Sequence, residues 1–156
     1  MYSIMSSQHN NITQVVVGVL FNHQNQVLIA KRPLHKPYPG LWEFPGGKIE
    51  PNESPLAALH REFFEELCLK LPNDPKSNAI KAFHEITYIR EPDYAVHLLV
   101  YKITEYIGEP IGAEGQEIKW VEQSDLINYE FPVANREIIE ILTQTSSALT
   151  PTESSS

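Results

Sequence analysis

The stretch Gly47–Leu69, GKIEPNESPLAALHREFFEELCL, decides the fold and is the starting point for the function. Ser54 followed by Pro55 is typical of a helix start, because serine accepts a hydrogen bond from a free amide and proline lacks an amide hydrogen that would need one. The sequence therefore predicts a helix from Pro55 to about Leu67. The apolar stripe that should dock this helix on a core consists of Leu56, Leu59, Phe63 and Leu67.

Three acids of this helix, Glu62, Glu65 and Glu66, stand at relative positions i, i+3 and i+4 and so project from one face. A like-charged pair at this spacing costs only about 0.2–0.5 kcal/mol, so a merely solvated acidic face is an alternative. Arg61 beside the acids and Glu53 just before the helix favour a metal site instead. Carboxylate oxygens suit Mg²⁺ or Mn²⁺, with positions left open for substrate phosphates.

This spacing resembles the Nudix box, the signature of hydrolases that act on nucleoside diphosphates linked to another moiety. Eight of the nine box positions are matched, by Gly47, Glu53, Arg61, Glu62, Phe63, Glu65, Glu66 and Leu69. The exception is Cys68, where the family has a glycine that ends the helix in the left-handed conformation. We expect a slightly different helix exit there, and a Cys68 side chain that is buried as a small hydrophobe.

The sequence on either side of the box looks like the MutT branch of this family, whose members remove oxidised guanine nucleotides from the precursor pool. LWEFPGGKIE precedes the helix, EFPVANREII lies near the C-terminus, and the similarity covers roughly Gln14–Leu142. The resemblance implies an α+β fold, the Nudix α/β/α sandwich with a mixed β-sheet between helices. It also implies that the Glu-Phe-Pro-Gly-Gly segment walls the nucleotide pocket and that an asparagine reads the base. The matching residues here are Glu43, Phe44, Pro45 and Asn135.

The resemblance further implies roles for the residues of the box. Glu65 and Glu66 would be Mg²⁺ ligands, and Glu62 would either bind metal or deprotonate the attacking water. Glu53 would ligate the metal or orient a ligand, and Arg61 would pair with an acid across the helix–loop junction to aim it. The alternative for Arg61 is a plain surface ion pair with Glu65, which contributes little.

Other candidate residues lie outside the box helix. The carbonyl of Gly46 is a possible metal ligand, since glycine lets the backbone approach an ion closely, but a simple tight turn explains it equally well. Glu114 matches a MutT-branch acid that reaches the metals, and is otherwise an ordinary loop acid. Arg32 matches a substrate-contacting arginine whose forked donors suit a phosphate or a base oxygen, and is otherwise a solvated charge at a strand end. Lys48 would touch phosphate or balance Glu50.

Two residues bear on base recognition. Asn135 can both donate and accept hydrogen bonds, so it can match a purine edge that has gained a proton at N7 and an oxygen at C8; its alternative is to cap the C-terminal helix. Tyr94 and the loop around it depart from the MutT branch, which tends to carry a basic residue there. The six histidines show no ligand spacing.

Size and charge limit the possible functions. A chain of 156 residues with 42% hydrophobic content can bury one good core, and a net charge of −8 argues against binding a nucleic acid polymer. Segment Glu43–Glu66 alone contributes −4, so metal has to reverse the local field before a triphosphate can approach. A single cysteine, no signal-like N-terminus and no long apolar run favour a cytoplasmic protein without membrane contact. We expect a monomer.

The predicted organisation is a flexible N-terminus (1–11), a Nudix hydrolase domain (12–143) and a disordered Ser/Thr-rich tail (144–156). Gln14–Phe21 and Gln26–Lys31 should form a hairpin, and a proline-rich loop should lead to a short strand at Leu41–Phe44. The other expected elements are strands at Ile80–Ile89, Ala95–Thr104 and Glu117–Val121, and a helix at Pro132–Thr143 that buries Val133, Ile138, Ile139 and Leu142.

These patterns predict a Mg²⁺-dependent nucleoside triphosphate pyrophosphohydrolase that releases a nucleoside monophosphate and pyrophosphate. The resemblance, and not the composition, selects attack at the β-phosphorus and 8-oxo-dGTP as substrate. Alternatives in the same enzyme class are an ADP-sugar, a dinucleoside polyphosphate or another nucleotide. A non-enzymatic Nudix-like binding module is a further alternative, although such modules generally lose the box acids that this chain retains.

Overall fold

The computed structural model describes residues 11–91 and 94–144. The strands are β1 (Ile12–Leu20), β2 (Val27–Lys31), β3 (Trp42–Glu43), β4 (Gly46–Lys48), β5 (Ile80–Glu91), β6 (Tyr94–Ile103) and β7 (Ile118–Val121). The helical elements are α2 (Pro55–Leu67), the 3-10 turns η1 (Gln123–Asn128) and η2 (Val133–Asn135), and a C-terminal helix over residues 136–144. Apart from Asn11 and Gln144, the predicted flexible N-terminus (1–11) and disordered tail (144–156) lie outside the described part, so these two assignments remain predictions.

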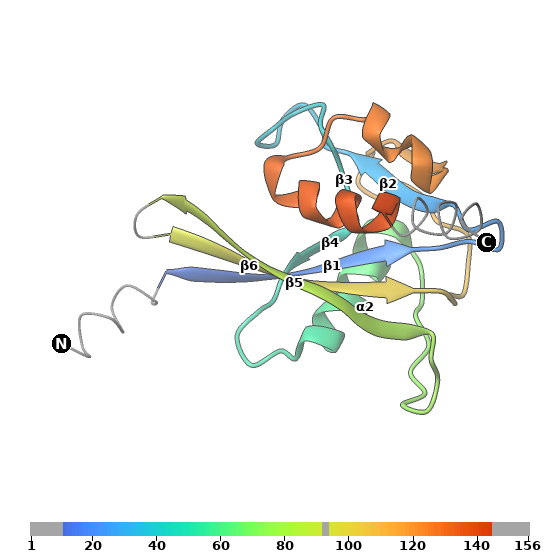
Figure 1. Ribbon diagram of the computed structural model, residues 1–156. Helices are drawn as coiled ribbons and strands as arrows, with labels where there is room; N and C mark the ends of the chain where they lie inside the picture. The colour runs from blue at the N-terminus through green and yellow to red at the C-terminus, as the bar shows by residue number, and fades with distance from the viewer. Residues whose placement is uncertain (1–10, 92–93, 145–156) are drawn as a thin grey trace, which may run out of the picture.

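The strands form two sheets. One has the order β4-β1-β6-β5, in which β1 and β6 are parallel and the other pairs antiparallel. The other is antiparallel, with the order β3-β2-β7. Figure 1 shows α2 on one face of the larger sheet and the C-terminal helix, in red, on the opposite face. The predicted mixed sheet between helices is therefore confirmed.

Strand β1 divides the core into two layers. Val16 and Leu20 pack with α2, whereas Val17 and Val19 pack with the C-terminal helix. A strand buried on both faces lies inside its sheet, and both edges of β1 are taken, by β4 and β6. The expected hairpin of β1 with β2 is therefore wrong, and only an isolated bridge between Phe21 and Val27 joins their ends.

Helix α2 has the bounds that its sequence predicts. The side chain of Ser54 accepts a hydrogen bond from the Ala57 amide at 3.1 Å, and Pro55 occupies the first turn. Of the predicted stripe, Leu59, Phe63 and Leu67 are buried, as is Ala58. Leu56 is 48% exposed, contrary to expectation, because the first turn of α2 faces the loop at residues 72–80 and not the sheet.

The end of α2 corrects both expectations for Cys68. Its backbone is left-handed (φ 58°, ψ 30°), as a glycine would be. Its amide donates to the carbonyl of Phe64 at 3.0 Å, and the amide of Leu69 donates to the carbonyl of Phe63 at 3.3 Å. These two helix-capping hydrogen bonds hold the exit in the usual geometry although the residue has a side chain. That side chain is exposed, because the left-handed exit turns it toward solvent.

The C-terminal helix buries Ile138 and Leu142, as predicted, with Ile139 partly buried. Val133 is 58% exposed, so its assignment to the buried side is wrong. The reason is that Val133 belongs to the 3-10 turn η2, whose three residues per turn place it on a different face from the helix that follows. No helix within residues 11–91 and 94–144 is long and apolar enough to cross a membrane.

Candidate active site

A cavity of about 590 Å³ opens between the larger sheet, α2, η2 and the loops that follow β2 and precede β7. Nine of the thirteen predicted site residues line it: Arg32, Glu43, Phe44, Gly46, Lys48, Glu62, Glu66, Glu114 and Asn135. The fold thus brings together residues that lie more than 100 positions apart in the sequence. A second cavity of about 560 Å³, at the start of α2, contains none of the predicted residues.

One end of the cavity is acidic. Glu62 and Glu66, one turn apart on α2, share a hydrogen bond between their carboxyl groups. Burial raises the pKa of Glu66 to about 9, and the negative charges of Glu62, Glu43 and Glu114 add to the effect. Burial also raises the pKa of Glu62, although Arg61 opposes this shift. Both shifts favour the protonated form of the pair in the absence of a cation.

Two glycines make this arrangement possible. A Cβ atom on Gly47 would overlap the carboxylate of Glu62, so only glycine lets the acid lie against the backbone there. A Cβ on Gly46 would overlap the backbone carbonyl of Val16 in the adjacent strand β1. Gly47 thus leaves space for the carboxylate of Glu62, whereas Gly46 leaves space for the backbone of the neighbouring strand β1.

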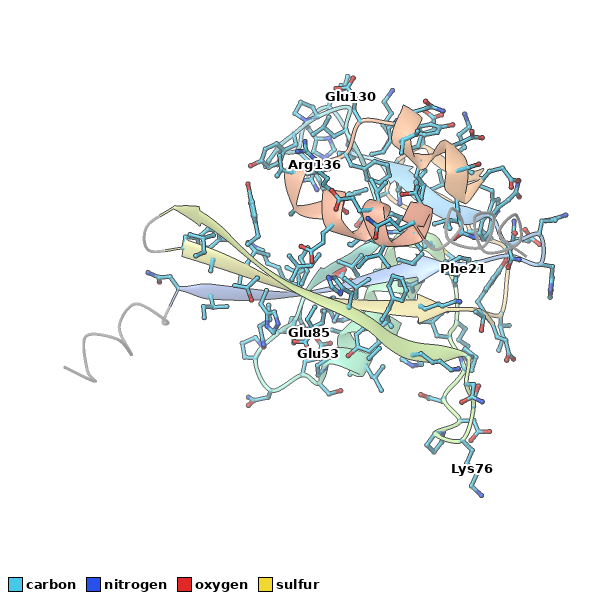
Figure 2. The ribbon with its side chains drawn as sticks, in the orientation of Figure 1. Phe21, Glu53, Lys76, Glu85, Glu130 and Arg136 are labelled. Carbon is cyan, nitrogen blue, oxygen red and sulfur yellow. The ribbon has the colours of Figure 1, made fainter. Side chains whose placement is uncertain are left out.

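Arg61 fastens the loop before α2 to the helix. Its Nε and Nη2 donate to the two carboxylate oxygens of Glu53, at 2.7 and 2.9 Å, and Nη2 also donates to the carbonyl of Lys48 at 3.0 Å. These hydrogen bonds lower the pKa of Glu53 to about 2. Neither residue lines the cavity, so the geometry places this pair behind the acids. Figure 2 shows Glu53 near α2, on the opposite side of the sheet from Arg136.

Two other predicted residues also lie outside the cavity lining. Glu65 is 54% exposed in its side chain and lies 3.3 Å from Nη1 of Arg61, so it completes the ion-pair group behind the acids. Its role as a metal ligand remains a prediction. Pro45 is buried, and its carbonyl accepts a hydrogen bond from the Gly18 amide at 2.8 Å. It thereby fixes the turn that leads into β4.

Cations line the cavity as well. Nη1 of Arg32 lies 2.7 Å from Glu43 Oε1, and its Nε donates to the carbonyl of Pro37. Nζ of Lys36 lies 3.7 Å from Glu114 Oε1, which joins the proline-rich loop to the loop before β7. Lys36 was not predicted as a site residue, because a lysine between prolines carries no signal of its own and only the fold brings it to the acids.

The other end of the cavity is mainly apolar. Its lining includes Val15, Val96, Leu98, Phe44 and Ala134. The side chain of Asn135 makes no hydrogen bond to the described part of the chain, so it caps no helix there and is available to a ligand. Thr13 and Tyr94 also line this end. Thr13 was not predicted as a site residue, because threonine is common in strands and so carries no functional signal by itself.

The acidic end of the cavity can hold a divalent metal ion. Within the described residues, no group of three His, Cys, Asp or Glu side chains forms a ready-made cage. Glu66 is nevertheless a partly buried carboxyl whose ionised form is disfavoured by desolvation and by three neighbouring acids, and a cation would relieve that repulsion. Mg²⁺ binds through one or two carboxylates and takes further ligands from substrate phosphates, so a complete protein cage is not required. The donor set fits such an ion.

Comparisons with known proteins agree with this geometry. Residues 12–142 match the NUDIX domain. The 8-oxo-dGTP diphosphatase of Haemophilus influenzae is 35% identical over 131 residues, which cover 84% of this chain and 91% of that protein. The CTP pyrophosphohydrolase of Escherichia coli is 29% identical over 126 residues, with 80% and 87% covered.

A solved structure gives the same result. A MutT structure, from work on the Aliivibrio salmonicida and Vibrio cholerae proteins, superposes with a TM-score of 0.74 at 33% identity and covers 86% of this chain and 99% of that one. Nudix hydrolases generally use a divalent metal, in accord with the acidic end of the cavity. From the domain match, the relatives and the shared fold, the chain belongs to the Nudix family and is a hydrolase of pyrophosphate bonds.

Proposed function

We propose that this protein is a Mg²⁺-dependent nucleoside triphosphate pyrophosphohydrolase that converts 8-oxo-dGTP to 8-oxo-dGMP and pyrophosphate. The observation that carries the proposal is that one cavity holds a partly buried acid pair at one end and the unpaired Asn135 amide, within the described residues, at the other. The two ends suit the two parts of a nucleotide. Relatives named 8-oxo-dGTP diphosphatase support this substrate.

In this proposal each end has its own task. Glu62, Glu66 and the Gly46 carbonyl would hold the metal, with Glu65 and Glu114 as further ligands. When bound, the ion would supply positive charge to the phosphate oxygens and lower the pKa of water. Glu62 is positioned to accept the proton of the attacking water, and Arg61, through Glu53, keeps the loop and helix in register.

The bond changes are those of an anhydride hydrolysis. The water oxygen bonds to the β-phosphorus while the bond from that phosphorus to the α–β bridging oxygen breaks. That oxygen leaves with the nucleoside monophosphate, and the β- and γ-phosphates leave as pyrophosphate. Arg32 and Lys48 bind phosphate oxygens, and the walls formed by Glu43 and Phe44 hold the nucleoside.

A substrate panel tests the proposal. Pyrophosphate release would be measured with 8-oxo-dGTP, dGTP, CTP, ADP-ribose and a diadenosine polyphosphate, each with Mg²⁺, Mn²⁺ or excess EDTA. We expect the highest kcat/KM for 8-oxo-dGTP, activity with either metal and none in EDTA. A higher kcat/KM for any other compound would refute the substrate, and full activity in EDTA would refute the metal.

CTP is the second candidate substrate, because the E. coli CTP pyrophosphohydrolase also matches most of the chain. The same panel decides between the two nucleotides. A substrate from the DNA precursor pool would place the enzyme in the cytoplasm. We also propose that it acts as a monomer, and light scattering at assay concentration would check this.

A further inference from the structure

The apolar end of the cavity has a floor made of two parallel strands. Alternate residues of a strand point to one face, so Thr13–Val17 of β1 and Tyr94–Leu98 of β6 each contribute every second side chain to this floor. The strands run in register, with Thr13 opposite Val96 and Val15 opposite Leu98. The floor is therefore a continuous stripe whose polar members, Thr13 and Tyr94, stand together at its far end.

One end of the stripe, at Val17, lies near the acids, and the other end, at Thr13, lies away from them. Val17 pairs with Gly46 of β4, next to the glycine against which Glu62 lies. From Val17 back to Thr13 the strand advances four residues, or about 13 Å at about 3.3 Å per residue. A nucleotide whose phosphates lie at the acid pair and which extends along this floor brings its base toward Thr13 and Tyr94.

The hydroxyl of Tyr94 is held in place by Thr13 and still has a hydrogen to donate. Thr13 Oγ1 donates to the phenol oxygen of Tyr94 at 3.1 Å. Because that oxygen accepts from threonine, its own hydrogen is free to donate elsewhere. No acceptor for it occurs within the described residues. The neighbouring lining is aliphatic, from Val96 and Leu98, so a hydrogen bond made there competes with little water.

We propose that Tyr94 is a base-recognition residue: its hydroxyl, positioned by Thr13, donates a hydrogen bond to an acceptor on the edge of the substrate's nucleobase. The inference rests on the proposed function, since it takes the acid pair as the phosphate end. Tyr94 and Asn135 then present two polar groups to one base in an otherwise apolar pocket. Two such groups discriminate between bases better than either alone, because a wrong base leaves one of them unpaired.

Binding of products tests this without depending on turnover. Dissociation constants of 8-oxo-dGMP, dGMP and dCMP would be measured by calorimetry for the wild type, Tyr94→Phe, Thr13→Val and the double variant. KM and kcat would be measured with the corresponding triphosphates, 8-oxo-dGTP, dGTP and dCTP. Tyr101→Phe is the matched control, since it removes a hydroxyl from the same strand on the opposite face, toward α2.

For the preferred monophosphate, we expect Tyr94→Phe to weaken binding about five- to tenfold, the effect of one hydrogen bond, and to raise KM more than it lowers kcat. Thr13→Val should weaken binding about two- to threefold, because it only releases the ring. The double variant should bind no more weakly than Tyr94→Phe, since Thr13 acts through Tyr94. Tyr101→Phe should bind as the wild type does.

Three results would overturn the assignment: affinity within twofold of wild type in Tyr94→Phe for all three compounds, additive effects of the two substitutions, or a fall in kcat alone. A wild type that hydrolyses no triphosphate yet binds a monophosphate through Tyr94 would refute the proposed function and keep this one. A wild type that neither hydrolyses nor binds any of the nucleotides would refute both.

Discussion

Cys68 occupies a backbone conformation that glycine adopts without strain. A residue with a side chain pays about 1–2 kcal/mol for a left-handed backbone, and here two amide-to-carbonyl hydrogen bonds at the end of α2 offset it. The exposed thiol contributes no burial that would compensate. Single residues of this kind show where the chain tolerates local strain to keep an element boundary fixed.

Replacing Cys68 by glycine should stabilise the protein by about 1 kcal/mol, because the strain disappears and little packing is lost. For a domain of this size, that corresponds to a rise in Tm of about 2–4 °C. Thermal unfolding followed by circular dichroism measures it. A marked fall in Tm would mean that the side chain makes contacts that stabilise the helix end.

Glu66→Gln should keep the fold and cut turnover by at least about 10²-fold, because it removes a charged ligand from the proposed metal site. The pH dependence of stability gives a second readout. The pKa of Glu66 is raised to about 9, so between about pH 4.5 and 9 the folded protein binds a proton that the unfolded chain releases. This group therefore lowers the stability of the metal-free protein as pH rises through that window.

In EDTA, the glutamine variant should consequently gain stability relative to wild type as pH rises from about 5 to 9. Urea unfolding at several pH values measures the difference. Glu140→Gln is the control, since it changes an exposed acid on the C-terminal helix. A difference between Glu66→Gln and wild type that does not change with pH, or wild-type turnover in the folded variant, would contradict the assignment.

At the scale of elements, α2 and β1 both approach strand β4 closely, and this gives the two glycines of that strand different roles. Gly46 and Gly47 are adjacent, yet one faces the backbone of β1 and the other the carboxylate of Glu62. A backbone neighbour cannot move without disturbing the sheet, whereas the end of a glutamate side chain can rotate away. The same substitution should therefore have different consequences at the two positions.

Gly46→Ala should destabilise the fold by about 1–3 kcal/mol, the usual range for an overpacked site. Gly47→Ala should leave Tm nearly unchanged but lower kcat/KM by about tenfold or more, because Glu62 loses its position in the acid pair. Thermal unfolding and kinetics on both variants measure the contrast. Equal loss of stability at the two positions would show that Glu62 cannot move aside.

Local signals made α2 predictable, and non-local pairing made β1 unpredictable. Ser54, Pro55 and the spacing of Leu59, Phe63 and Leu67 lie within one element, so the sequence contains what fixes its bounds. The partners of β1 come from residues 46–48 and 94–103, and no turn signal nearby can reveal them. A hairpin with β2 was the natural local interpretation, and the topology overrode it.

At the scale of the whole molecule, the fold brings an acid pair from α2 and the proposed base-recognition residues of η2 and β6 to one cavity. The acid pair follows from helical spacing and the box pattern. Lys36 and Thr13 meet the cavity only through the packing of the loops and the register of β1 with β6, so the sequence did not indicate them as site residues. Tyr94 stood out in the sequence only as a departure from the MutT branch. In the proposed function, the distance between the acids and these residues separates recognition of the base from hydrolysis.

That separation predicts the effect of Asn135→Ala. Asn135 lines the cavity through η2, whereas the acids come from α2, so the substitution should leave the metal chemistry intact. Loss of one base-edge hydrogen-bond pair is worth about 1–3 kcal/mol, so kcat/KM for 8-oxo-dGTP should fall roughly ten- to a hundredfold. The value for dGTP should fall much less, because dGTP lacks the proton at N7 that the amide oxygen would accept.

Side-by-side measurement of kcat/KM for 8-oxo-dGTP and dGTP, in wild type and in Asn135→Ala, gives the answer, with circular dichroism to check folding. Arg136→Ala is a suitable control, because Arg136 is the next residue in the chain but does not line the cavity. If both nucleotides lost activity equally in Asn135→Ala, the asparagine would support the shape of η2 without reading the base. The apolar end of the cavity would then select its nucleotide by shape and by the remaining polar group, Tyr94.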